Sequence, residues 1–205
     1  MRTIGVIPSR WGSTRFPGKS LAPICGRPLV AWVAEAVRRA RGLDEVIVAT
    51  DDDRIADAAR ACGVTVAMTP SDLPSGTDRV AAAANPGDDD IVINIQGDEP
   101  LIDPALIEAL AERLRTDDAY QMATAACPIT ERDELESRSA VKVVCDAGGG
   151  ALYFSRLPIP CRRDGDPDFG HGLYWRHLGI YAYRGAFLKR LVLEHYPLEK
   201  VEFIT

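Results

Sequence analysis

Short, strongly apolar runs alternate with amphipathic segments through the first half of the chain. Four of these runs are rich in Val and Ile and have the length of a strand: residues 3–7, 45–50, 64–68 and 90–95. Between the first two, apolar residues recur at helical spacing in a segment that Pro28 opens and Gly42 ends. Strands that alternate with helices predict a parallel sheet with helices on both faces.

Two more helices are indicated by residues that cap helix starts. Asp51 or Asp52 precedes a segment that runs to about Cys62, and Asp103-Pro104 opens another segment. After residue 120 the pattern predicts shorter elements, namely strands at 121–127, 141–145, 151–155 and 177–183, a turn at 146–150 and a helix at 187–193. We therefore predict one α/β domain, with a doubly wound, mostly parallel sheet in residues 1–120 and a smaller, more antiparallel half in residues 121–205.

Composition and charge narrow the classes of partner. The 205 residues carry a net charge of -6, which argues against a nucleic-acid binder. No apolar run approaches the ~18 residues of a membrane span. The five cysteines form no C-x-x-C pair, which favours a reduced protein of the cytoplasm. The first 30 residues nevertheless contain five Arg and Lys and no Asp or Glu, which indicates either a local anion site or a basic surface patch.

The basic segment contains "GSTRFPGKS", residues 12–20, which nearly spells the phosphate-binding loop of ATPases. In that loop four residues separate the first Gly from Gly-Lys-Ser/Thr, and a helix starts at the Lys. Here five residues intervene, and Pro23, Gly26 and Pro28 delay the next helix to about Pro28. The ATPase interpretation therefore fails on spacing and on context.

The same loop still contains what an anion site needs. It follows the first strand, and open α/β sheets bind ligands at the carboxyl ends of their strands. Ser13 and Thr14 offer hydroxyl donors, and the glycines let backbone amides approach an anion. Positive charge comes from Arg10, Arg15 and Lys19. A triphosphate suits this set of groups.

Two later loops are further candidates. "NIQGDEPLID", residues 94–103, follows the most apolar strand, and Asp98 stands there directly after a Gly. A carboxylate beside a triphosphate indicates Mg²⁺, although Asp98 and Glu99 are also compatible with a simple lead into a helix. "SGTDR", residues 75–79, is either a nucleotide contact or a capped helix start with an Asp78–Arg79 surface pair.

Seven segments occur together in the order and spacing of one family: "IPSRWGSTRFPGKSL", "ATDD", "SGTDR", "NIQGDEP", "VKVV", "ALYFSRLPIP" and "RHLGIYAYR". From about Thr3 to Glu202 the sequence resembles the 3-deoxy-manno-octulosonate cytidylyltransferases, also called CMP-Kdo synthetases. The resemblance implies a nucleotide-diphospho-sugar transferase-like fold and a homodimer. It also implies that CTP and 3-deoxy-manno-octulosonate (Kdo) react with Mg²⁺ to give CMP-Kdo and pyrophosphate, for lipopolysaccharide biosynthesis.

The resemblance further implies roles for individual residues. The groups that would hold the triphosphate are Arg10, Ser13, Arg15 and Lys19. Lys19 would offset charge on the leaving pyrophosphate, and it forms the catalytic set together with Arg15 and Asp98, the expected Mg²⁺ ligand. The remaining expected contacts of CTP are Ser75, Arg79 and Gln96. The residues expected to meet the sugar acid are Arg156, His177 and Tyr181.

The late assignments have structural alternatives, because His177 could be a hydrogen-bonded core histidine, and Tyr181 and Tyr183 could serve in packing. The family often has His where Leu73 stands, which is a local departure. It also continues beyond the segment that matches Pro197–Glu202, to a Gly-x-Asp-Thr stretch whose Asp supplies a second metal carboxylate, whereas this sequence stops at Thr205. Two alternative functions remain open: a truncated or regulatory nucleotide-binding relative without efficient turnover, and a cytidylyltransferase for another sugar acid.

Overall fold

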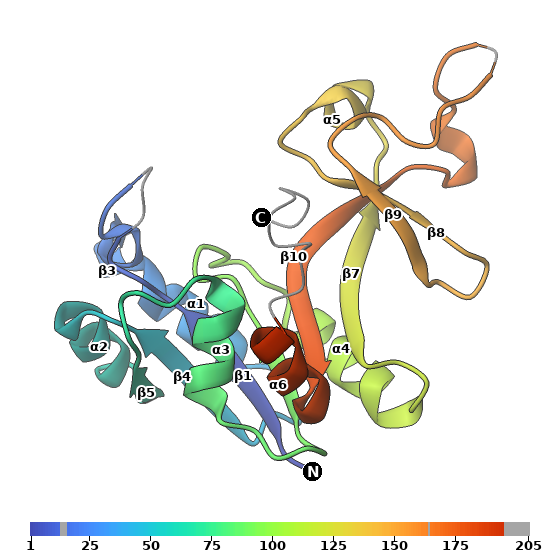
Figure 1. The fold of residues 1–205 in the computed structure, drawn as a ribbon. Helices are drawn as coiled ribbons and strands as arrows, with labels where there is room; N and C mark the ends of the chain where they lie inside the picture. Colours follow the sequence, from blue (N-terminus) through green and yellow to red (C-terminus); the bar gives the residue numbers. More distant parts are fainter. Residues whose placement is uncertain (13–15, 164, 195–205) are drawn as a thin grey trace. The chain divides into compact units, whose positions relative to one another are not determined.

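The computed structural model describes residues 1–12, 16–163 and 165–194, and the chain divides into two compact units (Figure 1). The first unit contains Met1–Ala123 and the described residues from Ile180 onward, and the second contains Thr124–Gly179. No helix in the described ranges is long and apolar enough to cross a membrane. The sequence pattern indicated a boundary at residue 120 but did not indicate that the chain returns to the first unit at Ile180.

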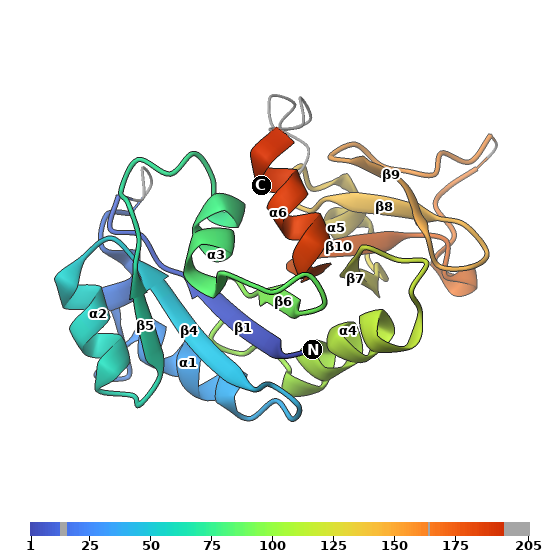
Figure 2. The ribbon, with the colours of Figure 1, turned by 60° about the horizontal axis from the view of Figure 1, so that its bottom comes forward.

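The first unit is built on a parallel sheet. Its parallel strands are β1 (Thr3–Pro8), β4 (Glu45–Thr50), β5 (Thr65–Met68) and β6 (Ile91–Asn94). They lie in the order β5-β4-β1-β6, and the end of β10 (Trp175–Arg184) adds to β6 as an antiparallel neighbour (Figure 2). The fold class predicted from the hydrophobic pattern is therefore confirmed.

Five helices flank this sheet among the described residues: α1 (Leu29–Arg38), α2 (Asp53–Arg60), α3 (Gly76–Ala84), α4 (Pro104–Thr116) and α6 (Gly185–Glu194). Three of them start at a side chain that caps them, as the sequence predicted. The carboxylates of Asp52 and Asp103 accept from backbone N–H groups of α2 and α4, and Ser75 caps α3.

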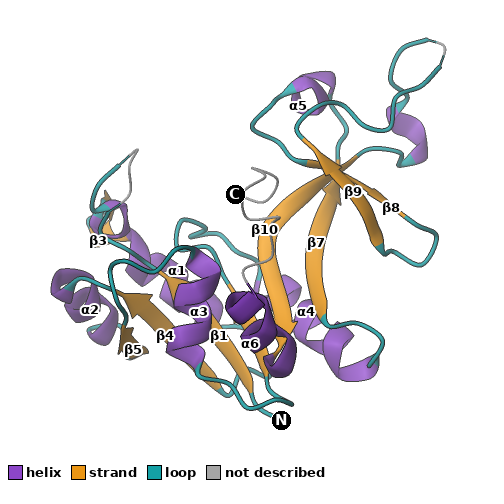
Figure 3. Cartoon of the chain, viewed as in Figure 1, coloured by secondary structure: helices purple, strands orange, loops and turns teal. Residues whose placement is uncertain are grey.

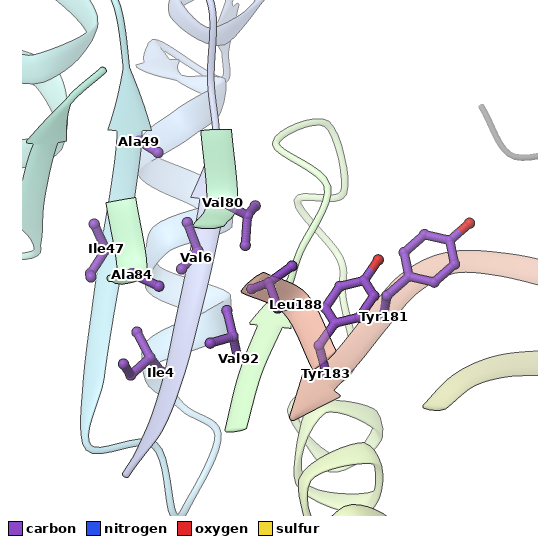
Figure 4. Packing of buried hydrophobic residues seen from close by; sticks show 10 residues of the cluster. All are labelled: Ile4, Val6, Ile47, Ala49, Val80, Ala84, Val92, Tyr181, Tyr183 and Leu188. Carbon is purple, nitrogen blue, oxygen red and sulfur yellow. The ribbon is translucent and has the colours of Figure 1, made fainter. Parts of the chain in front are cut away.

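The helices cover both faces of the sheet (Figure 2). On one face Ile4 and Val6 of β1 pack with Val80 of α3 and Leu188 of α6 in a cluster of buried residues (Figure 4). On the other face Gly5 lies against α1, where a Cβ on Gly5 would meet Val37 at 3.5 Å. Burial of these aliphatic side chains on both faces contributes the main hydrophobic stabilisation of the unit.

The described residues between β1 and α1 form short elements. A 3-10 turn, η1 (Lys19–Leu21), is followed by the two-residue strands β2 (Pro23–Ile24) and β3 (Arg27–Pro28). The helix α1 then begins at Leu29 rather than at Ser20. The rejection of an ATPase loop is therefore confirmed, because no long helix starts at the Gly-Lys-Ser segment.

The second unit is antiparallel. It contains β8 (Lys142–Cys145), β9 (Ala151–Ser155) and parts of β7 (Met122–Pro128) and β10, and β8 pairs with both β9 and β10 in antiparallel register (Figure 3). The turn between β8 and β9 is closed by the Asp146 N–H, which donates to the Gly150 carbonyl at 2.8 Å. Two short elements that the sequence pattern missed are α5 (Arg132–Glu136) and η2 (Phe169–His171).

Candidate functional site

The two loops that the sequence singled out first leave neighbouring strands of the first unit. β1 has β4 on one side and β6 on the other, so the strand order reverses direction at β1. Ligands of open α/β sheets bind at such a reversal, outside the carboxyl ends of the strands. There the Lys19 Nζ donates to the Asp98 Oδ2 at 2.5 Å, and both side chains remain nearly half exposed. The structure thus brings together two residues that are far apart in the sequence.

Gly97 allows the loop after β6 to approach the end of β1. A Cβ at Gly97 would lie 2.8 Å from the Pro8 carbonyl oxygen and 2.9 Å from the Ser9 Oγ, closer than real Cβ contacts. Any other residue would push this loop away from β1. The Gly before Asp98 is therefore explained by close packing, and it sets the carboxylate at the mouth of the site.

Trp11 anchors the opening loop. Its backbone N–H donates to the Asp51 Oδ1 at 3.0 Å, and its backbone carbonyl accepts from the Gly18 N–H at 3.0 Å. The Arg54 guanidinium lies over its ring at 3.4 Å from the centroid. Gly18 has φ +70, and a Cβ there would meet the indole at 2.7 Å. Sequence reasoning assigned no role to Trp11, although it stands inside the matched "IPSRWGSTRFPGKSL" segment.

Arg79 is a buried cation behind this anchor. Only 3% of it is exposed, and its guanidinium donates to the Thr69 hydroxyl and to the Asp51 Oδ2, the latter at 3.3 Å. The alternative of an Asp78–Arg79 surface pair is therefore wrong, because the guanidinium points inward to Asp51. Asp51 links Arg79 to Trp11, so "SGTDR" and the opening loop are held by one carboxylate.

Ser75 forms a complete capping box at the start of α3. Its Oγ accepts from the Asp78 N–H at 3.2 Å, and the Asp78 carboxylate accepts from the Ser75 N–H at 3.1 Å. The capped helix start is thus confirmed, while a contact of Ser75 or Arg79 with a nucleotide stays a prediction.

The other residues of the expected triphosphate site are only partly described. Arg10 is exposed at the end of β1, and Gln96 is partly buried just after β6. Ser13, Thr14 and Arg15 lie outside the described residues, as does the segment Pro197–Glu202.

A divalent cation fits the chemistry of Asp98. The described ranges contain no group of three or more His, Cys, Asp or Glu side chains arranged to hold a metal ion. Mg²⁺ does not require such a group, since it binds through one or two carboxylates together with substrate phosphates and water. The exposed carboxylate of Asp98, beside a lysine suited to phosphate, is a donor of this kind.

In the second unit, His177 lies on β10 and is partly buried. Its Nε2 lies 2.9 Å from the Thr124 Oγ1, and its ring meets the Phe154 ring edge-on at 5.1 Å. Burial lowers the pKa of His177, which favours the neutral imidazole. Arg156 stands two residues beyond Phe154, and its guanidinium donates to the Arg138 carbonyl at 3.0 Å. Two of the three predicted sugar-acid residues therefore lie in the second unit, His177 on β10 and Arg156 directly after β9.

The third predicted residue, Tyr181, belongs to the first unit. It is 8% exposed and stacks on Tyr183 with ring centroids 6.1 Å apart, and both rings lie on the same face of β10 (Figure 4). Burial raises the pKa of Tyr181, and it raises the pKa of Tyr183 to about 12, so both phenols are protonated at neutral pH. The packing role that the sequence offered as an alternative is present, and contact with a sugar acid stays a prediction.

Comparisons with known proteins agree on one enzyme class. The family model described as cytidylyltransferase matches residues 4–203. A 3-deoxy-manno-octulosonate cytidylyltransferase of Bdellovibrio bacteriovorus is 49% identical over 93% of this chain and 77% of its own length. Proteins of the same name from Tolumonas auensis and Anaeromyxobacter sp. are 47% and 50% identical, over 98% and 92% of this chain and 82% and 76% of their own lengths.

Solved structures agree with the sequence matches. A structure described as CMP:2-keto-3-deoxy-manno-octonic acid synthetase complexed with CTP is 39% identical, with a TM-score of 0.85, and the match covers 99% of this chain and 87% of that one. A cytidylyltransferase from Leptospira borgpetersenii is 20% identical with a TM-score of 0.60, over 93% of this chain and 63% of that one. The latter likeness concerns the fold alone.

Proposed function

The chain belongs to the 3-deoxy-manno-octulosonate cytidylyltransferase family, and we propose that it transfers CMP from CTP to the anomeric hydroxyl of Kdo. The products are CMP-Kdo and pyrophosphate. The observation that carries this proposal is the 47–50% identity to proteins of this one name over more than nine-tenths of the chain. The pair of Lys19 and Asp98 at the strand-order reversal supports it independently.

In the proposed reaction the anomeric oxygen attacks the α-phosphorus of CTP, and the bond from that phosphorus to the pyrophosphate oxygen breaks. The protein contributes mainly by positioning the reactants and by offsetting charge that moves onto the leaving group. Lys19 is suited to the second task, because its ammonium is a mobile point charge at the mouth of the site.

Lys19 and Asp98 exchange partners when substrate binds. In the structure each neutralises the other, with the Lys19 Nζ 2.5 Å from the Asp98 Oδ2. A triphosphate would take Lys19, and the freed carboxylate of Asp98 would hold Mg²⁺, which when bound neutralises phosphate oxygens. Arg10 joins Lys19 at the triphosphate, and the family pattern adds Ser13 and Arg15.

The proposed contacts of the nucleotide outside the opening loop come from the start of α3 and from the loop after β6. Ser75 and Gln96 are the proposed contacts at the start of α3 and after β6, the latter near the base. Arg79 is proposed to support the nucleotide and acts at least through Asp51, since its guanidinium is buried on that carboxylate. The proposed contacts of the sugar acid are Arg156 for its carboxylate and His177 and Tyr181 for its hydroxyls.

The setting of the reaction is part of the proposal. All five cysteines lie within the described residues and form no disulfide, which supports a reducing cytoplasm. Lipopolysaccharide biosynthesis would consume CMP-Kdo.

The second unit exposes more than half of each of three large apolar side chains, Leu152, Tyr153 and Leu157, which supports a homodimer that covers them. The net charge of -6 argues against nucleic acid as a partner.

The direct test is pyrophosphate release from CTP in the presence of Mg²⁺, measured with and without Kdo. We expect release only when both are present, and we expect ATP, GTP and UTP to replace CTP poorly. A chelator should stop the reaction, and excess Mg²⁺ should restore it.

Two results would redirect the proposal. Tight CTP binding without release in the presence of any sugar acid would indicate a regulatory relative. Release with another sugar acid but not with Kdo would keep the cytidylyltransferase activity and change its acceptor.

A further inference from the structure

Lys142 is a fully buried lysine on the central strand of the second unit. Its exposure is 0%, and its neighbours across the sheet are Ser155 of β9 and Arg176 of β10. A lysine is almost never fully buried unless it is paired. In the part of the chain that the structure describes, no carboxylate pairs with its ammonium.

Three backbone carbonyls surround the ammonium instead. The Lys142 Nζ donates to the carbonyls of Ser137, Ala140 and Arg156, each at 2.7 Å. An ammonium has three N–H donors, so each donor has an acceptor, and the charged form is fully hydrogen-bonded. Two of these carbonyls belong to the turn at 137–140, and the third lies just after β9.

These contacts hold Arg156 at two places, its main chain and its guanidinium. Lys142 holds the main chain of Arg156 through its carbonyl, and the Arg156 guanidinium donates to the Arg138 carbonyl in the turn that Lys142 also holds. The position of the guanidinium therefore depends on the buried ammonium. The residue before Lys142 contacts β10, because the Val141 carbonyl accepts from the backbone N–H of His177 at 2.8 Å.

We propose that Lys142 is the positioning residue of the sugar-acid site, which orients Arg156 for the carboxylate of the acceptor. The proposal rests on the proposed function. Lys142 also leaves a positive charge that no carboxylate among the described residues neutralises, so an anionic acceptor gains attraction from two cations. Burial, and after it the charge of Arg156, lowers the pKa of Lys142, as expected for an ammonium that no carboxylate neutralises.

The test compares Lys142→Met with the unaltered chain in steady-state kinetics. Met keeps the volume of the stem but removes the charge and the three donors. We expect the KM for Kdo to rise by about ten-fold or more, since a misplaced Arg156 would lose charge-assisted hydrogen bonds to the acceptor carboxylate. The KM for CTP should stay unchanged, because CTP is assigned to the first unit. A merely structural role would not separate the two constants.

The matched control is Lys189→Met, which removes an exposed lysine paired with Asp88 at 2.9 Å in the first unit. It should leave both constants unchanged. Lys142→Arg is the second variant: it keeps the charge but cannot aim three N–H groups at the same carbonyls, so we expect a smaller rise in the KM for Kdo. If Lys142→Met fails to bind CTP and is therefore misfolded, Lys142→Arg decides.

The outcomes separate this inference from the proposed function. An unaltered chain that makes no CMP-Kdo overturns the proposed function and this inference with it. An active Lys142→Met variant with an unchanged KM for Kdo, or an equal rise for Kdo and CTP, overturns the inference alone.

Discussion

Arg79 in the first unit and Lys142 in the second are both buried cations, but they are held in different ways. The Arg79 guanidinium is paired with the Asp51 carboxylate. The Lys142 ammonium is surrounded by three backbone carbonyls. A carboxylate cancels a buried charge, whereas carbonyl dipoles replace the water around it and leave the charge in place.

The difference separates two ways of preparing a site for an anion. In the first unit Arg79 is paired with Asp51 and Lys19 with Asp98, and we propose that the exposed pair of Lys19 and Asp98 separates to bind a polyphosphate and a cation. In the second unit the charge of Lys142 stays available to an anionic ligand. We expect an anion to replace Asp98 as the partner of Lys19 in the first unit, and to bind in the second unit without breaking an existing ion pair.

Breaking the exchangeable pair should have the largest effect. Asp98→Asn keeps the shape of the side chain but removes the charge that balances Lys19 and would hold a metal. We expect turnover to fall on the order of 10²–10³-fold with the fold intact, because the cation that Asp98 would hold offsets charge on the reacting phosphates. Initial rates at saturating CTP and Kdo measure it, and far-UV circular dichroism checks the fold.

Asp88→Asn is the control for this variant, since Asp88 also pairs with a lysine at an exposed position but precedes β6 and has no part in the proposed site. Its turnover should match that of the unaltered chain. Unchanged turnover of Asp98→Asn would remove the metal role and the exchange together.

Breaking the buried pair should affect stability. Arg79→Met leaves Asp51 charged and only 10% exposed on its side chain, and the free energy of unfolding should fall by about 3 kcal/mol. Urea denaturation measures it. Arg39→Met removes an exposed pair with Glu35 and should cost about 0.5 kcal/mol or less. Equal losses in the two variants would show that the Arg79–Asp51 pair has no special weight.

Asp90 extends the comparison to a buried carboxylate. The backbone N–H of Arg2, the N–H of Gly87 and the Arg2 guanidinium hold the pKa of Asp90 down to about 2, against an ordinary value of 3.8. A lowered carboxyl pKa stabilises the fold above the ordinary value, and this contribution is lost as the pH falls through about 2. It amounts to about 2 kcal/mol.

The measurement is the free energy of unfolding between pH 6 and pH 2 for the unaltered chain and for Asp90→Asn. The unaltered chain should lose about 2 kcal/mol more than the variant over this range. Asp89→Asn changes an exposed neighbour and should follow the unaltered chain. Parallel curves for Asp90→Asn and the unaltered chain would contradict the assignment.

The anchor of the opening loop should give the smallest effect. Trp11→Leu removes the ring that lies under Arg54 and against Gly18, and the KM for CTP should rise about five-fold, as expected for a loss of about 1 kcal/mol. Trp32→Leu is the control, because Trp32 also lies against an arginine, Arg27, at 4.9 Å. A similar KM for CTP in both variants would mean that Trp11 only packs.

Most of the fold could be predicted from the sequence, because its signals are local. The caps Asp52, Ser75 and Asp103 stand next to the helices that they start, and each buried strand is a continuous apolar run. The contact between Lys19 and Asp98 could be anticipated because the loop of each follows such a strand, while their role as a binding site stays a prediction. The helix α5 was missed because its five residues are too few to display a helical period.

Long-range partners could not be predicted in the same way. Asp51 binds the main chain of Trp11 and the side chain of Arg79, and both choices depend on the order of the strands rather than on any local pattern. Lys142 stands in the "VKVV" segment, where no local pattern identifies the three carbonyls that accept from its ammonium, those of Ser137, Ala140 and Arg156. Ile180 lies within β10, so no change of composition marks the return of the chain to the first unit.

The path of β7 and β10 has a consequence for how such an enzyme changes over time. In the first unit the Arg184 N–H donates to the Gln121 carbonyl, and in the second the Thr124 hydroxyl donates to the Leu178 carbonyl. Thr124–Gly179 is therefore an insertion whose entry and exit strands are neighbours. Segments inserted in this way can be lengthened, shortened or exchanged while the host keeps its ends fixed. The part of the proposed acceptor site that Arg156 and His177 form would then be exchanged as one segment, separately from the proposed contacts of the nucleotide.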